Sequence, residues 1–298
     1  MAQRIAAWLV EKPFHGVLGL SFTLLLPFAQ FFTGAAITAL VLSLGLARSL
    51  LLAAAAAALV VLLSLVTGAA GVALLINAAL YWIPAALLAA LLQRTRSLTL
   101  TLQVTALLAL LAVIGFELLV ADPLAFWRQQ IEAFAAGFAS VGLEQQASIL
   151  RDNQDVLAPQ MTVLIGVTTW SLMSLVLVLG YRMHCLLPEA QNRYGRFCDL
   201  NLGRSLAIGV AVAAVLALVS GAAWLQNVAI TGFAAYWLQG LALMHWLRVE
   251  GGLPTAVLIV VYGLLLVLNV LLVIALAATG YGDAWLNVRA RMKKRAGS

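Results

Sequence analysis

The stretch Ser49–Gln93 reads SLLLAAAAAALVVLLSLVTGAAGVALLINAALYWIPAALLAALLQ and contains no Asp, Glu, Lys or Arg. About 20 apolar residues cross the hydrocarbon core of a bilayer, so this stretch is long enough to cross it twice. Four further runs without these residue types are each long enough for at least one crossing. They cover residues 13–47, 156–181, 205–247 and 251–282. The sequence therefore predicts a protein that crosses a membrane several times.

The composition supports the same class. Of the 298 residues, 64% are hydrophobic and only 9% are charged, whereas soluble domains average roughly 25% charged residues. Inside lipid the backbone must satisfy its own hydrogen bonds, which leaves helix bundles and closed barrels. Barrel strands are short and alternate in polarity, but these runs are continuous and rich in Leu and Ala. We therefore expect an all-α, polytopic transmembrane helix bundle.

Pro, Gly and charged residues divide the bundle into eight or nine predicted spans. The predicted segments are Gly16 up to Pro27, Gln30–Ala47, Ser49–Thr67, Val72–Leu92, Leu98–Ala121, Gln160–Met183, Arg204–Trp224, Val228–Trp246 and Thr255–Thr279. We expect one integral membrane domain, residues 1–298. It comprises an N-terminal half (1–121), an amphipathic surface segment (122–158) and a C-terminal half (159–298).

The surface segment has its own sequence signature. Asp122 followed by Pro123 is a strong helix start, with Asp as the N-cap and Pro at the first helical position. Apolar residues then recur at helical spacing opposite polar ones. The apolar set is Leu124, Trp127, Ile131 and Phe134; the polar set is Arg128, Gln129 and Glu132. With the polar stretch from Glu144, the amphipathic region near residues 122–155 is predicted to lie along the membrane surface.

The distribution of basic residues does not determine how the chain is oriented in the membrane. A cytoplasmic C-terminal tail places Arg182, Arg193, Arg196, Arg204 and Arg248 outside, and the reverse orientation exports the tail itself. The tail cluster is Arg289, Arg291, Lys293, Lys294 and Arg295. Beside a membrane span, such a cluster indicates contact with anionic headgroups of membrane lipids and not with nucleic acid. The bacterial inner (cytoplasmic) membrane is the expected location.

Polar residues inside the predicted spans are candidates for ligand binding, because lipid makes such residues costly. The candidate set is Asn77, Tyr81, Arg182, His184, Gln239 and His245. Arg182 at a helix end could hold a carboxylate or phosphate of a ligand, and equally a lipid phosphate. Interhelical hydrogen bonds explain Asn77 and Tyr81 as well as a ligand does. A lone histidine such as His245 is more often a packing residue.

A second pattern predicts helix packing. Gly209, Ala213, Ala217 and Gly221 form a stripe of small residues at four-residue spacing, and small residues let helix backbones approach closely. No Walker, GxGxxG, GxSxG or HExxH motif occurs. Gly280 to Asp283 match the letters of the GxGD pattern of intramembrane aspartyl proteases, but Asp283 follows its predicted span and no second aspartate falls within one. We expect no cofactor, no metal and no enzyme activity.

The C-terminal third resembles the YybS-like family of multi-spanning bacterial membrane proteins, whose biochemical role is unassigned. The resemblance rests on LQGLALMH at 238–245, Gly252-Leu253, Tyr262 and GYGDAWLNVR at 280–289. It implies that a set of residues matters to fold or function: Gln239, Gly240, His245, Asp283, Trp285 and Arg289. This sequence departs from the family pattern at 181–193. Family members typically have an Arg-Trp-Trp-Gln-like helix end followed by a Tyr-Asn-Pro-Gly-Gly-Phe-like turn, and this chain has YRMH and PEAQNR there.

The last six spans are also similar in architecture to substrate-capturing subunits of energy-coupling-factor transporters. That likeness implies arginine-bearing loops over an anionic substrate. We therefore predict a subunit that binds or helps to transport a small molecule, with any ATPase supplied by a membrane protein partner. The alternative is a non-catalytic membrane scaffold or assembly factor for envelope proteins; an intramembrane enzyme ranks third.

Overall fold

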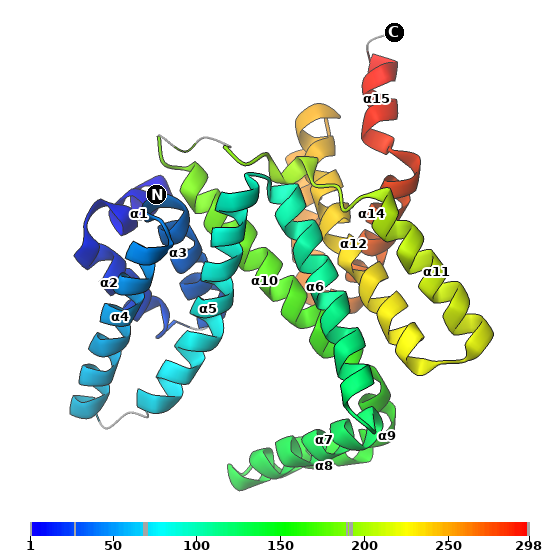
Figure 1. Cartoon of the computed structure of the whole chain (residues 1–298), viewed down its shortest axis with the longest axis horizontal. Helices are drawn as coiled ribbons and strands as arrows, with labels where there is room; N and C mark the ends of the chain where they lie inside the picture. Colours follow the sequence, from blue (N-terminus) through cyan, green and yellow to red (C-terminus); the bar gives the residue numbers. More distant parts are fainter. Residues whose placement is uncertain (1, 27, 68–70, 189, 191–192, 297–298) are drawn as a thin grey trace. The chain divides into compact units, whose positions relative to one another are not determined.

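A computed structural model describes residues 2–26, 28–67, 71–188, 190 and 193–296. Over these residues the chain is helical and contains no strand (Figure 1). The expected all-α class is therefore confirmed. Pro27, residues 68–70 and positions 189, 191 and 192 of the departing PEAQNR stretch lie outside the described residues.

Within the described residues, five helices are long and apolar enough to cross a membrane, which agrees with an integral membrane protein. They are Leu46–Val66, Gly71–Thr95, Leu98–Leu119, Gln154–Cys185 and Ala223–Glu250. Four apolar helices are shorter: Ala29–Leu44, Arg204–Ser220, Thr255–Leu265 and Val270–Leu286. The total of eight or nine spans stays a prediction.

The chain forms two compact units, each built from two parts of the sequence. Unit 1 comprises Met1–Leu102 and Ser171–Leu200, and unit 2 comprises Gln103–Trp170 and Asn201–Ser298. This division differs from the predicted boundaries at 121/122 and 158/159. It differs because two long helices, α6 (Leu98–Leu119) and α10 (Met161–Cys185), contribute residues to both units.

Unit 1 is built around a helix that is buried on all sides. Its helices are α1 (Ala2–Glu11), α2 (Pro13–Thr23), α3 (Ala29–Leu44), α4 (Leu46–Thr67) and α5 (Gly71–Thr95), with the ends of α6 and α10 and the short helix η2 (Phe197–Asp199). Every residue of α3 from 33 to 42 is buried. A Cβ atom at Gly34 would lie 2.7 Å from Cγ1 of Val176, and one at Gly180 would overlap Thr38. The small residues are therefore what lets α10 approach α3.

Unit 2 contains the remaining helices. They are α7 (Pro123–Ser140), α8 (Glu144–Asp152), α9 (Gln154–Leu157), η1 (Ala158–Gln160), α11 (Arg204–Ser220), α12 (Ala223–Glu250), α13 (Thr255–Val267), α14 (Asn269–Leu286) and α15 (Val288–Ala296). Gly221, at a φ of 67°, ends α11, and α12 returns directly from that turn. Trp224 therefore belongs to α12 and not to the preceding span.

The packing of α12 against α14 depends on two glycines. A Cβ atom at Gly240 would overlap the carbonyl oxygen of Leu276, and one at Gly280 would overlap that of Tyr236. Both obstacles are backbone atoms, which cannot move aside as a flexible side chain can. Gly240 and Gly280 thus allow the two backbones to touch.

The single predicted span Thr255–Thr279 is wrong. The structure breaks it at Leu268 into α13 and α14, and α14 continues to Leu286. Hydropathy alone did not locate this break, because the stretches on both sides are apolar apart from Asn269, which directly follows Leu268. The prediction that Asp283 follows its span is also wrong, since Asp283 lies within α14 and is buried.

Because of this break, the segment that follows α12 turns back and ends on the side of unit 2 where it began. Arg204, at the start of α11, has its guanidinium carbon 5.3 Å from the ring centroid of Trp285, near the end of α14. Because α11 and α12 form a hairpin, the end of α12 returns to this same end of unit 2. Figure 1 shows α15 there as well, while α7–α9 lie at the opposite end. Residues 251–286 therefore leave and return at one end of unit 2.

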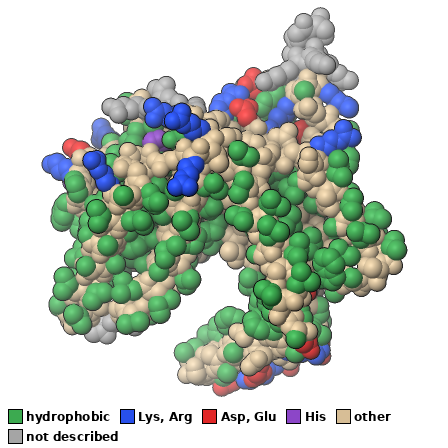
Figure 2. Space-filling view, in the orientation of Figure 1, with side chains coloured by type: hydrophobic (Ala, Val, Ile, Leu, Met, Phe, Trp, Pro, Cys, Tyr) green, Lys and Arg blue, Asp and Glu red, His purple; other side chains and the backbone are tan. Residues whose placement is uncertain are grey.

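The α7–α9 segment confirms the predicted helix start. The Asp122 side chain accepts a hydrogen bond from the backbone N–H of Ala125, and Pro123 occupies the first turn. Ion pairs join α7 to the following helices: Arg128 with Asp155 at 2.8 Å and Arg151 with Glu132 at 3.0 Å. Hydrogen bonding and charge from Glu132 raise the pKa of the Arg151 guanidinium. Figure 2 shows charged side chains along the outer edge of the segment.

Replacing Gly280 by Ala is expected to destabilise unit 2 by about 1–3 kcal/mol, because the added methyl group forces the α12 and α14 backbones apart. Gly282→Ala is the matched control, since a Cβ atom there meets no described atom within 4 Å. Thermal unfolding in detergent measures both variants. Equal melting temperatures for the two would contradict the close backbone contact.

Candidate functional site

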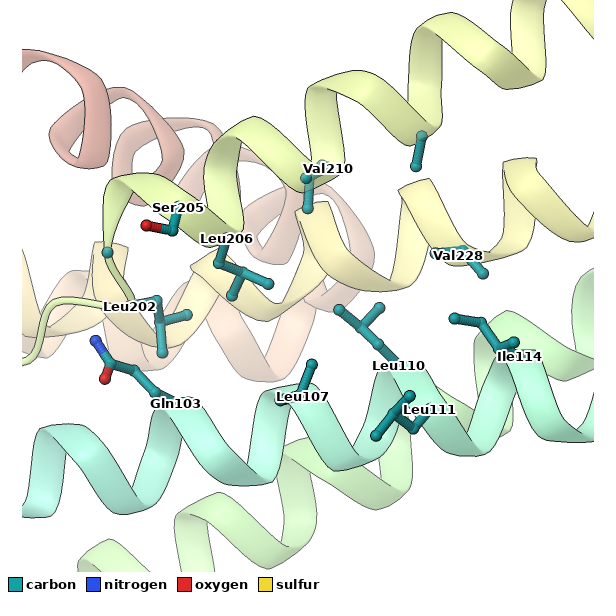
Figure 3. Close-up of a pocket in the computed structure, with 13 residues that line it drawn as sticks. Gln103, Leu107, Leu110, Leu111, Ile114, Leu202, Ser205, Leu206, Val210 and Val228 are labelled. Atoms are coloured by element: carbon teal, nitrogen blue, oxygen red, sulfur yellow. The ribbon is translucent and has the colours of Figure 1, made fainter.

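Unit 2 carries a groove of about 560 Å³ between α6, α11 and α12 (Figure 3). Its walls are mainly apolar. The lining residues are Gln103, Leu107, Leu110, Leu111 and Ile114 from α6, Leu202 and Gly203 before α11, Ser205, Leu206, Gly209, Val210 and Ala213 from α11, and Val228 from α12. Figure 3 shows Gln103, Leu202 and Ser205 at one end and Ile114 and Val228 at the other.

Two small residues keep the groove open on the α11 side. A Cβ atom at Gly209 would meet no described atom within 4 Å, and Ala213 lies one turn farther along the same face. Gly209 and Ala213 belong to the stripe predicted to pack against another helix. Within unit 2 they border the groove instead, while Gly221 forms the turn after α11. Ala217 is half-buried beyond the groove lining.

At the Ile114 end, α6 and α12 are tied together by a polar contact. Asn227 donates its side-chain amide to the Glu117 carboxylate at 2.8 Å. Glu117 and Asn227 thus hold the two walls of the groove at a fixed separation near that end. This contact lies beyond the apolar lining, so the lining itself remains hydrophobic.

The opposite, polar end of the groove is formed by the segment before α11. Gln103 donates to the carbonyl oxygen of Asn201 at 2.8 Å, and the Asn201 side chain accepts from the N–H of Gly203 at 2.8 Å. Gly203 has a φ of 91°, a conformation that favours glycine. This turn directs the chain into α11 and places Ser205 beside the groove.

Two buried side chains of α12 form hydrogen bonds with the segment before α11. Gln239 accepts a hydrogen bond from the N–H of Leu202 at 2.7 Å, and the Tyr236 hydroxyl donates to the carbonyl oxygen of Gly203 at 2.9 Å. Both side chains are fully buried. The position of the polar end therefore depends on the interior of unit 2 and not on exposed loop contacts.

The Gln239 amide is itself held by a buried carboxylate. Its Nε2 donates to Asp283 Oδ2 at 3.0 Å, and the backbone N–H of Val288 donates to Oδ1 at 3.1 Å. Arg289 lies 3.5 Å from the same carboxylate. Asp283 is 3% exposed, and a buried charge is stable only with such partners.

Asp283 also fixes the end of α14. Asn287 has a φ of 49° and ends the helix, and α15 begins at Val288, whose N–H the Asp283 side chain accepts. A residue of α14 thus caps α15 while it orders Gln239. Five of the six residues that the family resemblance singled out lie in this neighbourhood: Gln239, Gly240, Asp283, Trp285 and Arg289. The sixth, His245, contacts Tyr262 of α13 instead.

The six predicted ligand-binding residues do not gather around the groove. Asn77, Tyr81, Arg182 and His184 belong to unit 1. Asn77 is exposed and donates to Ala73 of its own helix; Tyr81 is half-buried and Arg182 is exposed. His184 is buried, and its Nδ1 lies 2.9 Å from the Ser43 hydroxyl.

The other two belong to unit 2. Gln239 serves the buried cluster described above, and Nε2 of His245 lies 2.8 Å from the Tyr262 hydroxyl, which joins α12 to α13. Their ligand-binding role stays a prediction.

Sequence reasoning missed the groove. Its lining residues are ordinary span residues, and the pairing of Gln103 with Asn201 joins positions 98 apart in the chain. The signal that could have indicated it is the Gly209–Ala213 spacing. Small residues on one helix face are compatible with a groove as well as with a closely packed helix. Among the described residues, no group of three or more His, Cys, Asp or Glu side chains could hold a metal ion.

No protein-family model, curated protein or solved structure matches the chain. The resemblance to the YybS-like family and the likeness to energy-coupling-factor subunits therefore stay predictions.

Replacing Asp283 by Asn is expected to destabilise the protein by roughly 3–5 kcal/mol, because it leaves Arg289 charged and without its buried carboxylate. Asp155→Asn serves as the control, since Asp155 pairs with Arg128 at the surface. Thermal unfolding in detergent compares the two variants. A melting temperature of Asp283→Asn as high as that of Asp155→Asn would contradict a central role for the cluster.

Proposed function

We propose that this chain is an integral membrane protein of the bacterial inner membrane that binds a small amphiphilic molecule in the groove of unit 2. It would capture or help to transport that molecule without a nucleotide site of its own. The groove, with hydrocarbon walls and one polar end, is the observation that carries the proposal.

The chemistry of the lining supports an amphiphile. Ligand sites are typically concave and mostly apolar, with few polar groups that fix the orientation of the ligand. Leu107, Leu110 and Val210 offer hydrocarbon contacts, while Gln103 and Ser205 offer hydrogen bonds at one end only. A fully polar ligand would leave most of its groups unsatisfied against these walls.

The distribution of charge supports an orientation in the membrane. Arg204, Arg248 and Arg289 belong to the end of unit 2 that also carries α15, and basic residues favour the cytoplasmic side. At the other end, α7 and α8 expose apolar side chains such as Phe134 and Ile149 as well as charged ones such as Arg128 and Glu132. This pattern suits a helix pair lying in the membrane interface. The polar end of the groove would then face the cytoplasmic leaflet.

A scaffold role has one observation in its favour. Gly209 and Ala213 leave a shallow face on α11 that could receive the helix of a membrane protein partner. The two functions differ in what occupies the groove of the purified protein, and one experiment separates them.

Ala213→Phe is expected to remove the bound amphiphile, because the phenyl ring fills the groove. Ala217→Phe is the matched control, one turn farther along α11 and outside the lining. Native mass spectrometry of protein purified in mild detergent detects retained lipid-sized molecules. Retention by wild type and Ala217→Phe, with loss in Ala213→Phe, is the predicted result. A groove without any such molecule, together with a co-purifying protein lost in Ala213→Phe, would support the scaffold instead.

The orientation predicts which positions share a side of the membrane. In a background with Cys185 and Cys198 replaced by Ser, single cysteines at Glu250 and Met292 should react with an impermeant thiol reagent from the cytoplasmic side only. A cysteine at Gln145, in α8, should react from the opposite side. Labelling of Met292→Cys and Gln145→Cys from one side would refute the orientation.

A further inference from the structure

Four exposed arginines of unit 1 lie at the ends of apolar helices, and together they form an arginine cluster. Its members are Arg48 in the first turn of α4, Arg94 in the last turn of α5, Arg96 between α5 and α6, and Arg182 in the last turn of α10. These four helices are candidate membrane spans. Each arginine therefore lies within one turn, about 5 Å, of the end of a span. Long side chains at this position reach the level of the lipid headgroups.

Hydrogen bonds between the helix ends bring the cluster to one end of unit 1. Gln93, next to Arg94, donates its side-chain amide to the carbonyl oxygen of Val41 at 2.8 Å. Nδ1 of His184, near the end of α10, lies 2.9 Å from the Ser43 hydroxyl. The ends of α5 and α10 thus both contact the end of α3, just before α4 begins. Figure 2 shows Lys and Arg side chains gathered at this end of the unit.

The arginine cluster has no carboxylate partner among the described residues of unit 1. The two described carboxylates are Glu11, which lies 4.0 Å from Nδ1 of His15, and Asp199, which pairs with Arg196 at 2.8 Å. The carboxylate of Glu189 lies outside the described residues. Positive charges that share one end of a unit without a described counter-charge favour an anionic partner.

The backbone at Arg96 supports a role for its side chain. Arg96 has a φ of 52°, a left-handed conformation that glycine adopts more readily than arginine. Its N–H donates to the carbonyl oxygen of Leu92 at 2.9 Å and so closes the end of α5. Because glycine would suit this turn better, the turn itself gives no reason for an arginine at this position.

The opposite end of unit 1 is uncharged in sequence. The residues that join α2 to α3 (24–28) and α4 to α5 (68–70) include no Asp, Glu, Lys or Arg. An anionic lipid in that leaflet would therefore meet no arginine of the unit. Basic residues favour the cytoplasmic side, and the cytoplasmic leaflet carries anionic lipids.

We propose that the arginine cluster binds the phosphate of an anionic phospholipid in the cytoplasmic leaflet. Guanidinium groups donate paired hydrogen bonds that match the oxygens of a phosphate. The acyl chains lie in the bilayer along exposed apolar residues of the same helices, such as Leu51 of α4 and Leu87 of α5. This site is separate from the groove, whose lining residues all belong to unit 2.

An acidic protein surface fits these observations less well. A soluble domain contacts residues that project beyond the headgroups, whereas the four arginines lie within one turn of the span ends. A lipid phosphate lies at that depth in every part of the leaflet.

The experiment compares dioleoyl phosphatidylglycerol with dioleoyl phosphatidylcholine, which share their acyl chains and differ in net charge. Native mass spectrometry measures binding to the full-length protein, delipidated in detergent. Each arginine near a lipid phosphate contributes about fivefold in affinity. The double variant Arg94→Gln/Arg96→Gln should therefore bind the anionic lipid at least about tenfold more weakly than wild type, with binding of the zwitterionic lipid unchanged. Arg94→Lys/Arg96→Lys should retain part of the preference, and Arg182→Gln provides an independent variant.

The charge-matched control is Arg248→Gln/Arg291→Gln, which removes the same net charge from unit 2. This control and the groove variant Ala213→Phe should both keep the wild-type preference, and thermal unfolding verifies that each variant is folded. Equal losses in the two double variants would show that net charge alone is responsible and would overturn the site. Loss in Ala213→Phe would assign the bound lipid to the groove instead. Full displacement by inorganic phosphate would refute a lipid ligand. Absence of any lipid preference, with an acidic protein that co-purifies with wild type and not with Arg94→Gln/Arg96→Gln, would replace the lipid by a protein partner.

Discussion

A carboxylate buried in an apolar helix bundle must be surrounded by donors, and this constraint organises the C-terminal unit. The Asp283 carboxylate accepts hydrogen bonds from the Gln239 amide and the Val288 backbone N–H, and it pairs with the Arg289 guanidinium. The partners come from two helices: Gln239 from the middle of α12, and Val288 and Arg289 from the start of α15. Because Gln239 also accepts from the N–H of Leu202, the same network reaches the segment before α11. A single buried charge thus connects the tail, two helices and the polar end of the groove.

Two close approaches of backbone make that network possible. Gly240 and Gly280 bring α12 and α14 into direct contact, which places Gln239 and Asp283 within hydrogen-bond distance. The groove is the complementary feature, since Gly209 and Ala213 leave space between α11 and α6 where no side chain fills it. Small residues therefore have opposite consequences within one unit. Between α12 and α14 they allow a close helix contact, and along α11 they leave a groove.

The sequence was sufficient for the class of fold and for several local features. Long charge-free runs predict helices in lipid, and Asp122-Pro123 predicts the start of α7, because both signals depend on residues close together in the chain. The break at Leu268 and the burial of Asp283 were not predictable in this way. Apolar residues carry the same hydropathy whether they face lipid, a helix or a groove. The pairing of Gln103 with Asn201 and of Gln239 with Asp283 depends on tertiary structure, so the groove emerged only from the fold.

The proposed function requires that a lipid-like molecule occupies the groove between α6 and α11. An experimental density map of the protein in a lipid nanodisc tests this most directly. We expect an elongated density along α6 from Gln103 to Ile114, ending in a compact feature beside Ser205. A groove closed by direct packing of α6 against α11, or filled by a helix of another protein, would contradict it.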